Sequence, residues 1–286
     1  MSYGRVITVE IGVPGARSRV LSSRDSRGDT ALLIGADIRR TSEGQTDSCE
    51  VRVANASSAE RAALQQEGAV CRVLAGLGAG PRNPRGSPSQ LFGGRVIPAS
   101  VDGPRRTGGD RMLTWSVSDG GFDLLDVFVS QAWRGPVSYA TVISDIVSGL
   151  DGLSAGAIVL GDPTARTRTA YAAVGRLRDV LDDLAIATNS WWSVQHGAVE
   201  FWPVGVARSA AAYTVGPGQG LIEAPSRIDV SRWSVRSVLL SGLLPGDAIG
   251  VRSGTVNGAM VVEDVHHAID SHAGPWETTV SGMVES

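Results

Sequence analysis

Two stretches of this chain, far apart in the sequence, show the same order of short strands and turns. In the C-terminal stretch, Leu243–Val284, alternating apolar residues predict three strands, around 249–251, 259–269 and 278–284. Three short sequences predict the turns, namely Pro245-Gly246-Asp247, Asn257-Gly258 and Ala273-Gly274-Pro275. Three antiparallel strands joined by short turns form one compact β unit.

The earlier stretch begins after Gly68 and repeats this order. Val70–Leu74 predicts a strand, and a loop rich in proline and glycine leads to a second strand over Gly94–Val101. A third strand follows, in which Leu113, Trp115 and Val117 alternate with polar residues. We interpret the two stretches as degenerate copies of one unit. A mainly β protein with two β-barrel or sandwich modules is therefore expected.

The segment between the copies has a different pattern. Val137–Leu150 and Tyr171–Ala187 place apolar residues at helical spacing. In the second segment the apolar stripe is Val174, Leu177, Leu181, Leu184 and Ile186. Trp191–Val194 and Ala198–Trp202 flank Gln195-His196-Gly197, which is typical of a hairpin. Two helices and a hairpin predict a small α/β insert. The expected domains are residues 1–120, a first β domain, 121–205, the insert, and 206–286, a second β domain.

The N-terminal part of the chain completes the first β domain. Residues 3–13, 31–40 and 49–53 predict strands, and the arginine-rich segment between the first two predicts an exposed loop. Ser57 or Ser58 can cap a short helix that ends before Gly68. Gly76–Gln90 contains four glycines and three prolines and predicts a second exposed loop.

Composition excludes several classes of protein. The net charge of −3 and the isoelectric point near 5.8 argue against a dedicated nucleic-acid binder. All 26 basic residues are arginine, which reflects either a GC-rich genome or arginines retained for ion pairs between subunits. No apolar run approaches the roughly 20 residues that span a bilayer, and no N-terminal signal sequence is visible. We expect synthesis and folding in the cytoplasm, with no membrane insertion.

The sequence predicts neither catalysis nor metal binding. It has no Gly-x-Ser-x-Gly elbow and no phosphate-binding loop. Cys49 and Cys71 fall on predicted strands and are expected to be buried free thiols. The consecutive Asp182 and Asp183 predict a solvated helix face. One cluster with metal-binding residue types remains, consisting of His266, His267 and His272 with Asp264 and Asp270.

Adjacent residues on a strand point to opposite faces, so His266 and His267 cannot share one ion without a bulge. We expect ordinary strand and turn histidines, no cofactor and no enzymatic activity.

Tryptophan is concentrated in the predicted hairpin, where Trp191, Trp192, Phe201 and Trp202 lie close together. One interpretation is a platform on which sugar rings stack. The other is that alternate positions pack on the two helices while the rest meet a neighbouring subunit. We favour the second interpretation.

The arrangement as a whole resembles the baseplate hub proteins of long-tailed bacteriophages and related contractile particles. The resemblance begins near Asp47 and rests on SCEVRVANASSAERAALQQEGAVCRVLAGLG, LFGGRV and SVSDG, followed by the two helices and the hairpin. It ends with SVLLSGLLPGDAIGVRSG, GAMVVEDVHHAID and GPWETTVSG. No single motif is diagnostic, and the resemblance carries over no catalytic residue.

This resemblance implies a structural virion protein with two tail-tube-like modules. Three copies would form a homotrimeric ring of six similar units, which adapts a hexameric tail tube to a trimeric spike and lets DNA pass through a polar lumen. Expected partners are the tail tube or distal tail protein, the central spike protein and the tape-measure protein. The expected location is the virion tail or baseplate, after assembly in the host cytoplasm.

We expect subunit contacts in the loop 76–90, at Arg105 and Arg106, and in the Trp191–Trp202 hairpin. The candidate residues are Arg82, Arg85, Arg105, Arg106, Trp191, Trp192 and Trp202. Two alternatives stay open: a carbohydrate-binding or cell-wall-acting tail protein, and the hub of a phage-like contractile injection particle.

Overall fold

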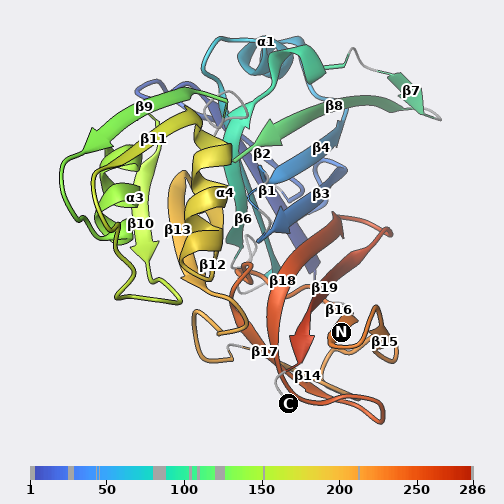
Figure 1. Cartoon of the computed structure of the whole chain (residues 1–286). Coiled ribbons are helices and arrows are strands. Elements are labelled where there is room, and N and C mark those ends of the chain that lie inside the picture. The colour runs from blue at the N-terminus through green and yellow to red at the C-terminus, as the bar shows by residue number, and fades with distance from the viewer. Residues whose placement is uncertain are drawn as a thin grey trace.

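The structure is a computed structural model of the 286-residue chain (Figure 1). It describes residues 4–24, 29–42, 44, 46–79, 88–102, 105–107, 110–119, 126–150, 152–211 and 213–284. The fold is mainly β, as predicted, and most strands belong to one 14-stranded sheet.

The first β unit consists of the strands of the N-terminal part. They are β1 (Gly4–Gly12), β2 (Arg19–Ser22), β3 (Ile34–Thr41), β4 (Ser48–Ala54), β5 (Val70–Ala79), β6 (Ser89–Val96), β7 (Arg105–Thr107) and β8 (Asp110–Ser118). Their order in the sheet is β3-β4-β8-β6-β5-β1-β2, with β7 paired to β8. Alternation buries one side of these strands in a common core that includes Ile7, Val51 and Trp115.

One helix and one 3₁₀ turn complete this unit. Helix α1 (Ser58–Leu64) is capped at Ser57, whose hydroxyl accepts from the Glu60 N–H while the Glu60 carboxylate accepts from the Ser57 N–H. The predicted cap is therefore confirmed. The 3₁₀ turn η1 (Pro98–Ser100) separates β6 from β7.

The second β unit is built from the C-terminal part. Its strands are β14 (Tyr213–Val215), β15 (Ser226–Arg227), β16 (Arg232–Val238), β17 (Ala248–Arg252), β18 (Asn257–Asp270) and β19 (Trp276–Val284). They pair in the order β15-β16-β19-β18-β17-β14 around a core of their own, which includes Val235, Ile249 and Val265.

The two units share a strand order, which confirms the doubling predicted from the sequence. β3-β4-β8-β6-β5-β1 of the first unit matches β15-β16-β19-β18-β17-β14 of the second. In both, three strands consecutive in the described chain neighbour one another, β5, β6 and β8 in one and β17, β18 and β19 in the other, apart from the short β7. The copies differ at one end, since β1 and β5 are antiparallel whereas β14 and β17 are parallel.

A direct strand pairing joins the two units. β18 is long enough to pair with β17 through its first half and with β3 through its second, where seven residue pairs run from Asp264↔Thr41 to Asp270↔Gly35. The two units therefore form one continuous sheet, and β3, β18 and β19 lie side by side in Figure 1.

The insert lies against one side of this sheet (Figure 1). It contains β9 (Phe128–Trp133), α3 (Tyr139–Ser148), β10 (Ser154–Ile158), β11 (Tyr171–Arg176), α4 (Leu177–Ala187), β12 (Ser190–Gln195) and β13 (Ala198–Pro203). The predicted hairpin is present as β12 and β13, and both helices pack on a separate core that includes Val142, Leu181 and Phe201.

Five expectations about local structure are wrong. The strand expected over Gly94–Val101 ends at Val96 and is followed by η1. The turn expected at Asn257-Gly258 lies at 253–256, because β18 begins at Asn257 and pairs there with Arg252. Tyr171–Arg176 is a strand paired with β9, so the second helix begins only at Leu177, and two residues of the expected stripe, Val174 and Ile186, are exposed. The expected loop from Gly76 to Gln90 is shorter, because β5 continues to Ala79 and β6 begins at Ser89. The arginine-rich segment contains β2, which pairs with β1.

Candidate functional site

The exposed side of the continuous sheet is polar across both β units. Cross-strand partners extend from one unit to the other, as in the row Arg236, Thr279, His266 and Arg39. We call the exposed and half-buried polar residues of these rows the polar face; they are Asp37, Arg39, Glu50, Arg52, Arg232, Arg236, Asp264, His266, Glu277, Thr279 and Ser281. The β3–β18 join thus does not interrupt the polar surface.

Acidic and basic side chains of the polar face neutralise one another. Arg236 lies 2.8 Å from Glu277 and Arg232 lies 2.6 Å from Glu263. Across the β3–β18 join, His266 Nε2 lies 2.8 Å from an Asp37 carboxylate oxygen. Burial alone would raise the pKa of Asp37, but the bonds from His266 and Arg39 lower it overall. The face carries many charges without a strong excess of either sign.

Beneath this face, where the insert meets the sheet, lies a group of buried polar side chains. We call Arg40, Asp47, Asp119 and Gln195 the junction cluster. The Arg40 side chain is fully buried; it donates to Gln195 Oε1 at 2.6 Å and to the Leu91 carbonyl oxygen at 2.7 Å. Its guanidinium also lies over the Phe92 ring, 5.2 Å from the centroid. Arg40 therefore contacts the insert and the first β unit at once.

Asp119 fixes the tip of the hairpin. Its carboxylate oxygens accept from the backbone N–H groups of His196 and Gly197, at 2.7 and 3.0 Å. Both residues have positive φ, 54° and 79°, as a tight two-residue hairpin turn requires. A carboxylate at the end of β8 thus positions the hairpin of the insert.

Burial controls the protonation of the cluster. It raises the pKa of Asp47 to about 8, although Arg40, 3.6 Å away, opposes this rise. Burial also raises the pKa of Asp119, against the effect of Arg40 and of the hairpin N–H groups. With a pKa of about 8, Asp47 is largely neutral at neutral pH, beside the buried guanidinium of Arg40.

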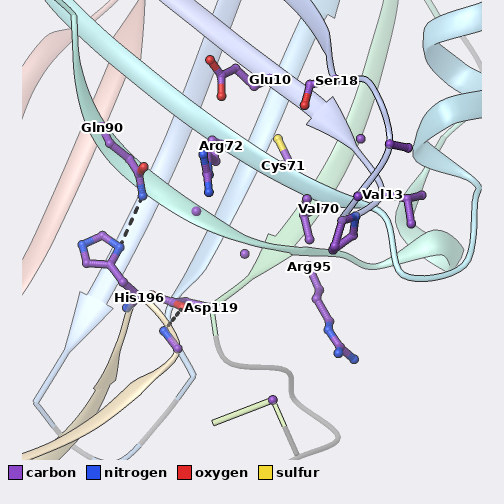
Figure 2. A pocket seen from close by; sticks show the side chains of 18 residues that line it. Glu10, Val13, Ser18, Val70, Cys71, Arg72, Gln90, Arg95, Asp119 and His196 are labelled. Carbon is purple, nitrogen blue, oxygen red and sulfur yellow. Dashed lines mark hydrogen bonds between the residues drawn. The ribbon is translucent and has the colours of Figure 1, made fainter. Parts of the chain in front are cut away.

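Beside the hairpin tip is a hollow of about 470 Å³, shown in Figure 2. It is lined by the β1–β2 turn, β5, β6 and the hairpin, with Glu10, Arg72, Arg95 and His196 among its polar side chains. The Gln90 amide nitrogen lies 3.5 Å from His196 Nδ1. Burial raises the pKa of Cys71, which also lines the hollow, to about 12, so its thiol is unreactive at neutral pH.

The tryptophans of the hairpin lie mostly inside the chain. Trp192 stacks on Phe201 and donates to Asp182, and Trp202 contacts Gly246 in the second β unit. Only 3% of Trp192 and 2% of Trp202 is exposed, which leaves little surface for a neighbouring subunit, whereas Trp191 is half-buried. The predicted packing of alternate hairpin positions on the helices is observed for Trp192 and Phe201.

The remaining candidate residues are in two places. Arg82 and Arg85 lie outside the described residues, and Arg105 and Arg106 lie in β7, of which the structure describes the backbone. The junction cluster did not emerge from the sequence reasoning, although Arg40 follows Ile34, Ala36 and Ile38 in the inward phase of its strand.

The histidines behave as expected for adjacent strand residues. His267 is buried and bonded to Thr278, and burial lowers its pKa to about 3, while His266 is on the opposite, exposed side. Among the residues that the structure describes, no group of three His, Cys, Asp or Glu side chains could hold a metal ion. Cys49 and Cys71 are buried and free, as predicted. In the described part of the chain, no helix is both long and apolar enough to cross a bilayer.

Comparison with solved structures shows which known proteins share this fold. No protein-family model and no curated protein sequence matches the chain. The 43 kDa tail protein of prophage MuSo2 from Shewanella oneidensis superposes with a TM-score of 0.65 at 12% identity, over 99% of this chain and 97% of that one. The fold is that of phage tail proteins.

Two further solved structures agree. The tail protein from Neisseria meningitidis MC58 has a TM-score of 0.59 at 12% identity and covers 98% of this chain and 97% of its own. The E. coli c3393 protein, a type VI secretion component described as similar to T4 tail proteins gp27 and gp5, has a TM-score of 0.59 at 12% identity. It covers 96% of this chain and 77% of its own.

Proposed function

We propose that this protein is a structural hub of a phage tail baseplate. Three copies would form a ring in which six similar β units surround a lumen, so that a hexameric tail tube meets one end and a trimeric spike the other. The proposed domains are residues 1–120 and 206–286, which form the ring, and the insert at 121–205.

The observation that carries this proposal is the doubled strand order within one continuous sheet. A closed ring needs repeated contacts of one kind, and two similar units per chain give sixfold contacts to a threefold assembly. The β3–β18 pairing already supplies one such contact within the chain.

The charge balance of the polar face supports the proposal that this face lines the lumen. DNA carries a dense negative charge and binds surfaces with an excess of arginine or lysine. The arginines of the polar face are paired with carboxylates, as in Arg236–Glu277 and Arg232–Glu263, so this face would let DNA pass without retaining it.

Proteins with the same fold support the proposed partners. The c3393 protein is compared in its description with gp27 and gp5, and two structures of the Francisella PdpA-VgrG complex superpose with a TM-score of 0.54. By this likeness we propose a tail-tube or distal tail protein on one face of the ring and a spike protein on the other, with the tape-measure protein as a further neighbour. The location would be the virion tail, or a phage-like injection particle in which the same ring would serve.

A structural role fits the described residues better than sugar binding. A sugar-stacking platform needs open aromatic rings, and the structure buries Trp192 and Trp202. We therefore propose a structural rather than a catalytic or carbohydrate-binding function.

Native mass spectrometry of the purified full chain tests the proposal. A trimer of three 29.8 kDa chains is expected, and negative-stain images should show rings with a central opening. A monomer at every concentration, up to hundreds of micromolar, would contradict the hub.

A further inference from the structure

The internal repeat predicts where two copies of the chain meet. Because the two β units share a strand order, the contact that joins them within the chain has a counterpart between chains. Within the chain, the outer edge of β3 pairs with the second half of β18. The contact between two copies must therefore join the equivalent of β3, in the second unit of one copy, to the equivalent of β18, in the first unit of the other.

The equivalent of β3 is β15 and the segment before it. β3 pairs with β4, which pairs with β8; β15 pairs with β16, which pairs with β19. Ile38 is opposite Cys49 and Arg227 is opposite Trp233, at matching places of the two ladders.

The equivalent of the second half of β18 is β7. β19 pairs with β18 along nearly its whole length, whereas β8 pairs first with β6, at Ser118 and Val117, and then with β7, from Met112 to Asp110. Arg105 opposite Met112 therefore occupies the place of Ala268 opposite Glu277.

Both of these edges are free in the part of the chain that the structure describes. β15 ends the path of the large sheet, and β7 pairs with β8 alone. They lie far apart, at the lower and upper right in Figure 1, as required of two surfaces that meet different neighbours.

The edge next to β15 is also unusually apolar for a surface. Ile222, Ile228 and Val230 are 46%, 52% and 86% exposed. Asp229 accepts from the N–H groups of Ser231 and Arg232, so the turn that presents Val230 is well ordered by bonds of its own. An open strand edge with large apolar side chains favours pairing with another chain.

We infer that β15 of one copy pairs antiparallel with β7 of a second copy, in the register Ser226↔Arg105 and Ala224↔Thr107. This register follows from Asp37↔Ala268 and Gly35↔Asp270 in the β3–β18 pairing. The inference rests on the proposed trimeric hub and names its subunit interface. It also assigns a place to two of the arginines expected at subunit contacts, Arg105 and Arg106.

Engineered disulfides test this register. The full-length double variant Arg105→Cys/Ser226→Cys, oxidised mildly, should give disulfide-linked dimers and trimers on a denaturing gel that disappear on reduction. Directly opposed strand residues lie close enough for such a bond. Each single variant should stay monomeric on the same gel, since Cys49 and Cys71 are buried.

A matched control uses the strand at the other end of the sheet. Val20 in β2 is 60% exposed, and Val20→Cys/Ser226→Cys should not cross-link. The protein could be a trimer in native mass spectrometry and yet form no Arg105–Ser226 cross-link, or form the Val20–Ser226 cross-link instead. Either result would overturn the proposed interface and leave the proposed hub intact. A monomeric protein would overturn both.

A second measurement needs no cysteine. Val230→Lys should raise the concentration at which the trimer dissociates at least about tenfold, because it places a charge in the buried interface. Val174→Lys, at an exposed valine on the insert, should leave that concentration unchanged. Equal effects of the two variants would contradict the interface.

Discussion

The molecule joins its parts in two different ways. The two β units meet through a backbone ladder of seven residue pairs between β3 and β18. The insert meets the sheet through side chains, chiefly the junction cluster of Arg40, Asp47, Asp119 and Gln195. A ladder depends little on which side chains it carries, whereas a buried cluster depends on every member. Replacing single residues should separate these two kinds of contact.

The largest effect is expected from Arg40→Met. This change leaves two buried carboxyl groups without their cation, and the loss of one partner of a buried ion pair costs about 3–5 kcal/mol. The free energy of unfolding, measured with denaturant, should fall by that amount. Arg39→Met is the matched control, since the Arg39 side chain is 73% exposed on the opposite side of the same strand. A comparable loss in the control would contradict the special role of Arg40.

Asp119→Ala should have the next largest effect. It removes the acceptor of two part-buried N–H groups, which costs roughly 1–3 kcal/mol. Hydrogen exchange should become faster at His196 and Gly197 but not along the β3–β18 ladder. Asp229→Ala is the control, because Asp229 also accepts from two backbone N–H groups but in an exposed turn. Faster exchange throughout the sheet after Asp119→Ala would show that the two joins are not independent.

Asp47→Asn should stabilise the protein, but only at higher pH. The folded-state pKa of Asp47 is about 8, above its ordinary value of 3.8, so the folded state binds the proton more tightly. Its contribution to stability is complete below about pH 4 and is lost as the pH rises towards 8. The melting temperature of Asp47→Asn should match that of the unmodified protein below about pH 4 and exceed it by a few degrees at pH 9. Equal melting temperatures at both pH values would contradict a proton on Asp47.

The smallest effect is expected from the ion pair across the ladder. His266→Gln removes the imidazole whose Nε2 lies 2.8 Å from the Asp37 carboxylate on the polar face, where exposed pairs of this kind contribute about 0–1 kcal/mol. Chemical unfolding should show a loss below about 1 kcal/mol. A loss as large as that of Arg40→Met would mean that side chains, and not the backbone ladder, hold the β units together.

The sequence predicts the strands that alternate cleanly and fails where alternation is weak. Leu113, Trp115 and Val117 identify β8 because each inward position is apolar. β2 (Arg19–Ser22) has one buried residue, Leu21, and its other apolar residue, Val20, is exposed, so no alternation distinguishes it from a loop. Tyr171–Arg176 resembles a helix because Val174 and Leu177 are three residues apart, but the pairing with β9 outweighs this local pattern.

The residues of the junction cluster follow the strand alternation of the sequence, but the alternation shows their role only once the fold is known. Arg40, Asp47 and Asp119 each continue the inward phase of an apolar strand, β3, β4 and β8 in turn. An inward charged residue at a strand end could equally face solvent. The three carboxyl and guanidinium groups are brought together by strand order and by the hairpin of the insert, which no local pattern specifies.

The pairing of β18 with β3 has a consequence for folding during synthesis on the ribosome. β3 is made long before its partner strand β18, so the nascent chain exposes the unpaired edge of β3 until β18 has left the ribosome. Premature encounters between neighbouring nascent chains would be most harmful during that interval, and truncation before Asn257 should yield aggregates rather than a smaller folded protein.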